Sequence, residues 1–135
     1  MVALPARCTS CVSNWNEEIT QEFDNGTRIA RASVTQTYSG DIAGESVVEY
    51  LMSYGVDGTV KFIGLEVITG SVGGREGSAV IQHDGTFVGN RARSDWSFVV
   101  GSGSGDLINL HGSGTFESID NQNVNSTFIY SFGER

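Results

Sequence analysis

Apolar and polar residues alternate along most of this chain. Alternation with a period of two places every second side chain on the same face of a sheet, so it predicts β-strands. No run of ten or more residues has the 3.6-residue apolar spacing of an amphipathic helix. The expected strands are eight: Trp15–Phe23, Thr27–Tyr38, Ser46–Ser53, Thr59–Gly70, Arg75–Phe87, Arg91–Ser102, His111–Ser118 and Val124–Phe132.

Turn-forming sequences separate these strands. Asn25-Gly26 and Asp57-Gly58 supply the positive φ angles that tight hairpins require. Antiparallel strands joined by short turns can close into a barrel, which leaves no exposed sheet edge. The sequence therefore predicts an all-β sandwich or barrel over residues 13–135, with eight antiparallel strands that can close into a β-barrel, after a flexible leader over residues 1–12.

The fourth expected strand places a carboxylate on an apolar face. Val60, Phe62, Glu66 and Ile68 share one side of this strand by alternation. A barrel of eight strands is wide enough to be filled by side chains or to hold one small ligand. Glu66 is therefore expected inside the barrel, in a filled core or beside a cavity.

The opposite face of the same strand is also apolar. It carries Ile63, Leu65 and Val67, a combination too apolar for a surface that faces water alone. No helix is expected that could cover it. We therefore expect a homo-oligomer in which a second subunit covers this face.

Composition excludes several classes of partner. The 135-residue chain has a formal net charge of −8 and its few basic residues are scattered, which opposes binding to nucleic acid and to anionic membranes. No segment approaches the roughly 18 apolar residues of a membrane span. The N-terminal sequence lacks the pattern of a signal peptide, so a cytoplasmic location is expected.

The two cysteines, Cys8 and Cys11, form a single C-x-x-C motif. A structural zinc site needs about four ligands, and no second C-x-x-C or histidine pair follows. A thioredoxin-like redox site needs a βαβ context, which the strand pattern does not provide. Reduced thiols in the leader are the expectation, and no metal site is expected.

Glu66 and His83 are the candidate catalytic residues. Burying an unpaired carboxylate costs several kcal/mol, so Glu66 is expected to be paired or to remain protonated, as suits a general acid or base. The alternative is a structural Glu66 that bonds a neighbouring strand or forms a salt bridge with Arg75. His83 could move a proton or orient a substrate. Its alternative is a strand-end histidine that bonds the backbone or Asp84.

Aromatic residues on interior faces are the candidate ligand-binding residues. Such rings can form the wall of an apolar pocket, or they can simply fill the barrel. Trp96 and Tyr130 can also direct a ligand through an indole N–H or a phenol O–H. Arg75 is a further candidate because it is an ionisable residue in otherwise apolar or small surroundings. The candidate ligand-binding residues are Phe62, Arg75, Trp96, Phe98, Phe128 and Tyr130.

Several segments, in order and at matching separations, resemble DUF3224, a family of small bacterial proteins of unknown function. The segments are Tyr38–Ser46, Gly58–Glu66, Gly74–Phe87, Gly101–Leu107 and His111–Phe116. This family is similar to the allene-oxide-cyclase-like barrels, so the resemblance implies a closed eight-stranded barrel, often oligomeric, that needs no cofactor. The superfamily includes cyclases whose apolar cavities fold a flexible substrate. Where an arginine usually follows Gly-Leu-Glu, this chain has Val67.

Together these observations predict a cofactor-independent barrel that binds a small apolar or amphipathic molecule. If it is catalytic, it is expected to be an isomerase or cyclase that uses Glu66 as acid or base, with His83 assisting. The alternatives are a carrier on the same barrel and a structural oligomer with a filled core.

Overall fold

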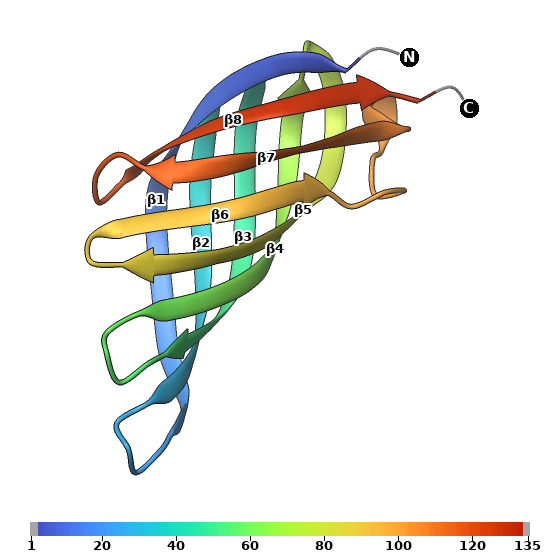
Figure 1. The fold of residues 1–135 in the computed structure, drawn as a ribbon. Helices are drawn as coiled ribbons and strands as arrows, with labels where there is room; N and C mark the ends of the chain where they lie inside the picture. The colour runs from blue at the N-terminus through green and yellow to red at the C-terminus, as the bar shows by residue number, and fades with distance from the viewer. Residues whose placement is uncertain (1–2, 134–135) are drawn as a thin grey trace.

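The computed structural model describes residues 3–133, which form one closed barrel of eight antiparallel strands (Figure 1). Each strand pairs with its neighbours in sequence, and β1 also pairs with β8 to close the barrel. The strands are β1 (Leu4–Glu22), β2 (Arg28–Gly40), β3 (Ile42–Tyr54), β4 (Val60–Val72), β5 (Arg75–Val88), β6 (Arg91–Phe98), β7 (Leu110–Ser118) and β8 (Asn123–Phe132). The predicted fold class and strand number are confirmed.

The structure corrects the prediction of a leader over residues 1–12. Residues 4–12 belong to β1, and Leu4–Cys11 pairs with β8. Closure of the barrel explains the difference, because β8 needs a second neighbour and only this segment supplies it. Residues 1 and 2 lie outside the described residues.

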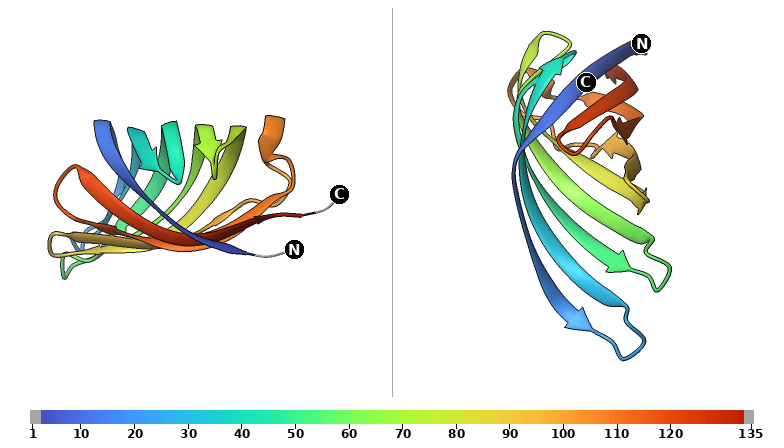
Figure 2. Two further views of the ribbon diagram at one scale, coloured as in Figure 1. Left: turned by 90° about the horizontal axis from the view of Figure 1, so that it is seen from above. Right: turned by 90° about the vertical axis from the view of Figure 1, so that its left-hand side faces the viewer.

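Hairpin turns use the predicted glycines. Gly26 has φ of 88° and Gly58 has φ of 85°, both in the region that side-chain-bearing residues avoid. Asn25 and Asp57 complete these turns, since each side-chain oxygen accepts the backbone N–H two residues later. The hairpins of β1–β2 and β3–β4 extend furthest from the barrel (Figure 2).

The strands differ in length around the barrel. β6 ends at Phe98 rather than at the expected Ser102, and a short 3₁₀ helix, η1 (Gly105–Leu107), lies between β6 and β7. Leu107 of η1 is fully buried and contributes to the core. No helix among residues 3–133 is long and apolar enough to cross a membrane.

The barrel interior has a filled half and a hollow half. In the filled half, rings pack in series: Trp96 contacts Phe98 and Phe128 at centroid distances of 5.3 Å, and Tyr130 lies 5.9 Å from Phe128. Along β4 the interior positions run from Phe62, which lines the cavity described below, through Glu66 to the fully buried Ile68. Glu66 thus lies between the two halves.

Candidate functional site

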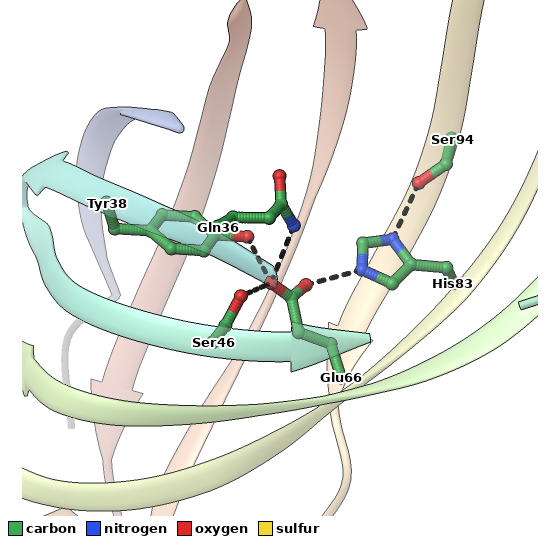
Figure 3. Close-up of polar contacts among 6 residues, drawn as sticks. All are labelled: Gln36, Tyr38, Ser46, Glu66, His83 and Ser94. Atoms are coloured by element: carbon green, nitrogen blue, oxygen red, sulfur yellow. Dashed lines mark hydrogen bonds and ion pairs between the residues drawn. The ribbon is translucent and has the colours of Figure 1, made fainter. Parts of the chain in front are cut away.

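A polar cluster built around Glu66 crosses the barrel interior. Glu66 is fully buried. Its Oε2 accepts hydrogen bonds from Ser46 Oγ at 2.6 Å, Tyr38 OH at 2.7 Å and Gln36 Nε2 at 3.1 Å (Figure 3). Three donors point at this one oxygen, so the arrangement suits a carboxylate.

His83 supplies the contact to the second carboxylate oxygen. Its Nε2 lies 2.7 Å from Glu66 Oε1, and its Nδ1 lies 3.0 Å from Ser94 Oγ. Because a carboxylate only accepts, Nε2 carries a proton in this geometry, and the Ser94 hydroxyl completes the ring's hydrogen bonding. The cluster therefore links five consecutive strands, β2 to β6, through side chains alone.

The structure brings Glu66 and His83 together but not Arg75. Arg75 pairs with Val72 beside the β4–β5 turn, whereas Glu66 pairs with Ile81. The guanidinium of Arg75 lies 3.9 Å from the centroid of the Phe132 ring. The predicted alternative of a salt bridge between Arg75 and Glu66 is therefore wrong. The alternative in which His83 bonds Asp84 is wrong as well. Alternation fixes the face of a residue but not its distance from a partner along the strands.

A cavity of about 540 Å³ occupies the hollow half of the barrel. Its inner wall is mainly apolar and includes Val34, Met52, Val60, Phe62 and Phe116. Exposed residues of three hairpin loops, among them Gly58, Asn90 and Gln122, line its mouth. The volume is within the usual range for small-molecule sites.

The floor of the cavity is polar. Gln36, Tyr38 and Tyr50 line it and are at least nine-tenths buried. The carbonyl oxygen of Gln36 points away from Glu66, whereas its amide nitrogen donates to that carboxylate (Figure 3). Glu66 and His83 do not line the cavity. The polar cluster therefore reaches the cavity only through Gln36 and Tyr38, which belong to both.

Tyr50 differs from Tyr38 in its hydrogen bonding. Within residues 3–133 no hydrogen bond is made by the Tyr50 hydroxyl, although the side chain is only 8% exposed. Its ring packs edge-on against Phe62, and Gly64 leaves room for it, since a Cβ there would lie 2.5 Å from a Tyr50 ring carbon. The hydroxyl is therefore free to bond a ligand.

Burial keeps both phenols protonated. Desolvation raises the pKa of Tyr38 well above its ordinary value, and the neighbouring Glu66 carboxylate raises it further. The same two causes, in the same order, raise the pKa of Tyr50. Both hydroxyls are therefore neutral hydrogen-bonding groups at physiological pH.

Of the six predicted ligand-binding residues, Phe62 lines the cavity. Trp96, Phe98, Phe128 and Tyr130 belong to the filled half, and Arg75 is exposed near the barrel end. Sequence reasoning missed the floor residues, although Tyr38 lies at the end of the predicted strand Thr27–Tyr38. The useful signal was the alternation in β2, where Val34, Gln36 and Tyr38 share a face with the fully buried Ala30 and Ala32.

The cysteines occupy different environments. Cys8 is buried and Cys11 is exposed, and neither forms a disulfide. Burial raises the pKa of the Cys8 thiol to about 12, and a hydrogen bond to Ser126 opposes this rise. Among the residues that the structure describes, no group of three or more His, Cys, Asp or Glu side chains could hold a metal ion.

A family model described as a protein of unknown function, DUF3224, matches residues 6–130. The chain belongs to the DUF3224 family. A crystal structure of a DUF3224 protein of unknown function from Shewanella oneidensis MR-1 is similar in fold, with a TM-score of 0.73. The two chains are 24% identical, and the similarity covers 99% of each. No curated protein matches this DUF3224 chain.

Proposed function

We propose that this barrel binds a small, mainly apolar molecule in its cavity. The observation that carries the proposal is the combination of a 540 Å³ apolar chamber with a polar floor. A purely structural barrel does not need a cavity. In a hollow barrel the atoms that line the cavity lack packing contacts on one side, and an apolar ligand restores those contacts.

The floor gives the ligand an orientation. The free Tyr50 hydroxyl can donate to a ligand oxygen, and the Gln36 carbonyl can accept from a ligand hydroxyl or N–H. A pure hydrocarbon would take both groups out of water without pairing them, which disfavours such a ligand. A molecule with one polar end and an apolar body fits this distribution best.

Proton transfer without a cofactor is the second candidate function. Tyr38 lines the cavity and bonds Glu66, and Glu66 in turn contacts His83. A substrate carbon acid could give its proton to the Tyr38 oxygen while the phenol proton moves to Glu66 Oε2. Returning the proton at a different carbon completes an isomerisation with no net change in atoms or electrons. His83 acts on Glu66 and does not touch the substrate.

A neutral fluorescent probe tests binding. N-phenyl-1-naphthylamine should bind with a stoichiometry of one per barrel and gain fluorescence. Ala92→Trp fills the cavity from β6 and should abolish the signal, whereas Val67→Trp adds the same side chain to the outer surface and should not. Equal binding by both variants would contradict the proposal.

Any molecule that co-purifies with the protein separates the two functions. Native mass spectrometry identifies it, and incubation with fresh protein shows whether it changes. In the catalytic case, Glu66→Gln abolishes turnover and retains binding. In the carrier case, the molecule is released unchanged from both proteins.

A further inference from the structure

The cavity is lined by acidic and aromatic side chains. Among residues 3–133, its lining includes the carboxylates Glu17 and Asp120 and no lysine, arginine or histidine. Seven aromatic rings also line it: Trp15, Tyr38, Tyr50, Tyr54, Phe62, Phe87 and Phe116. Aromatic faces attract cations through their quadrupoles, and carboxylates attract them by charge. Both features therefore favour a cationic ligand over an anionic one.

Glu17 is held at the cavity mouth by two aromatic side chains. Trp15 Nε1 donates to Glu17 Oε1 at 2.9 Å, and the Tyr54 hydroxyl donates to Oε2. Among residues 3–133, no basic side chain forms a salt bridge with Glu17. The carboxylate is thus fixed in place by neutral donors, and its charge is not balanced by an ion pair.

The Asp120 carboxylate forms hydrogen bonds within its own loop. Its Oδ1 accepts the backbone N–H groups of Gln122 and Asn123, and both carboxylate oxygens contact the Asn123 amide. These bonds lower the pKa of Asp120 and turn the side chain toward the β7–β8 loop. Glu17 is therefore the carboxylate that remains for a ligand.

Arg28 is the nearby basic residue and does not line the cavity. Its guanidinium lies 3.9 Å from the Tyr54 ring centroid, and its Nε is buried without a hydrogen-bond partner in the structure. Arg28 therefore occupies one face of Tyr54 and adds some positive potential at the mouth. It contacts Tyr54 and, among residues 3–133, forms no salt bridge with Glu17, which is exposed and therefore accessible.

We infer that the ligand is a hydrophobic amine whose ammonium group binds Glu17 beside Trp15 and Tyr54, with its apolar body in the chamber and the polar end described above on the floor. This inference rests on the proposed function and specifies its ligand. A fatty acid or another apolar anion would meet Glu17 at the mouth and Glu66 behind the floor. The formal net charge of −8 acts in the same direction.

Three compounds with one naphthyl body test the sign of the preferred charge. They are 2-(2-naphthyl)ethylamine, 2-(2-naphthyl)ethanol and 2-naphthylacetate, each titrated by calorimetry at pH 7 and low salt. We expect the ammonium compound to bind about tenfold more tightly than the alcohol, and the acetate about tenfold more weakly. Added salt should reduce the difference.

Glu17→Gln identifies the group responsible, because the amide can still accept from Trp15 but carries no charge. It should remove the preference for the amine and leave alcohol binding within about twofold. Glu18→Gln is the matched control, since Glu18 is exposed, does not line the cavity and makes the same change in net charge. It should leave the preference intact.

The outcomes separate this inference from the proposed function. If the amine binds no better than the alcohol, or if Glu17→Gln leaves its advantage unchanged, the cationic ligand is wrong and the binding cavity stands. The same holds if the protein binds N-phenyl-1-naphthylamine but not the amine. If neither the neutral probe nor any of the three compounds binds, both the inference and the proposed function are wrong.

Discussion

Glu66 and His83 form a buried pair, with 2.7 Å between Glu66 Oε1 and His83 Nε2 and side-chain exposures of 0% and 2%. The pair spans β4 and β5, and its remaining polar atoms bond side chains from β2, β3 and β6. Such a network stabilises a fold when every member is satisfied and destabilises it when one partner is removed.

Replacing Glu66 should therefore reduce stability strongly. Glu66→Ala leaves four donors without an acceptor and should lower the free energy of unfolding by about 3–5 kcal/mol. Glu66→Gln keeps one acceptor but turns an N–H₂ toward existing donors, so about 1–3 kcal/mol is expected. Urea unfolding measures both. Glu45→Gln, at an exposed position of β3, should change stability by less than about 0.5 kcal/mol.

Removing the hydroxyl from Tyr38 and from Tyr50 should affect different properties of the protein. Tyr38→Phe removes a bond to Glu66 and should cost about 1–2 kcal/mol of folding stability. Tyr50→Phe removes a hydroxyl that forms no hydrogen bond within residues 3–133, so stability should stay within about 0.5 kcal/mol, while binding of 2-(2-naphthyl)ethanol weakens. Equal thermal unfolding midpoints for both variants would argue against the assigned network.

The protein should lose stability at alkaline pH. The pKa of Cys8 is raised from 9.0 to about 12, and the pKa values of Tyr38 and Tyr50 are raised above 10.0, so all three groups stay protonated in the fold. The unfolded chain releases these protons first. The stabilisation is therefore complete below about pH 9 and is lost progressively as the pH rises toward 12. Urea midpoints measured against pH test this, and Cys8→Ala should make the decline smaller.

The same thiol should react slowly. The Cys8 thiolate is scarce at pH 8, and the side chain is buried, whereas Cys11 is exposed. Iodoacetamide should label Cys11 first, and peptide mass spectrometry gives the order. Preferential labelling of Cys8 would mean that the first half of β1 does not pair with β8 as described.

An apolar patch on the outer surface should mediate self-association. Val47, Leu51, Ile63, Leu65 and Val67 are each about half exposed, and β3 and β4 place them side by side. Light scattering at micromolar concentration should report an oligomer, and Leu65→Glu should dissociate it. Thr69→Glu, beyond the patch on the same face of β4, is the control. A monomeric parent protein would contradict this prediction.

Alternation and turn signals predicted eight strands and the interior position of Glu66, and the resemblance to DUF3224 implied the closed barrel. The pattern that places Phe62, Glu66 and Ile68 on one face is observed, and so is the exposed face with Leu65. The first half of β1 was not predicted, because its assignment depends on pairing with β8, which lies more than a hundred residues away in sequence. Local propensity carries no information about such a partner.

Strand register, and not the alternation of apolar and polar residues, determines which side chains meet at the site. Glu66 meets Gln36 and Tyr38 because β2, β3 and β4 are aligned so that Gln36 pairs with Ser46 and Ser46 with Ile68. A register shift of two residues would keep every face unchanged and give Glu66 other partners. For the same reason the sequence could not separate the rings that fill the barrel, such as Trp96, from Phe62 at the cavity.

The most direct test of the central claim is where a ligand binds. The chain contains two tryptophans, Trp15 at the cavity mouth and Trp96 in the filled half, and each gives one indole N–H signal in a ¹H–¹⁵N NMR spectrum. On titration with N-phenyl-1-naphthylamine, we predict a saturable shift of the Trp15 signal and of the Gln36 amide, with Trp96 unchanged. Shifts confined to the outer face around Leu65, or no saturable shift, would contradict a binding cavity.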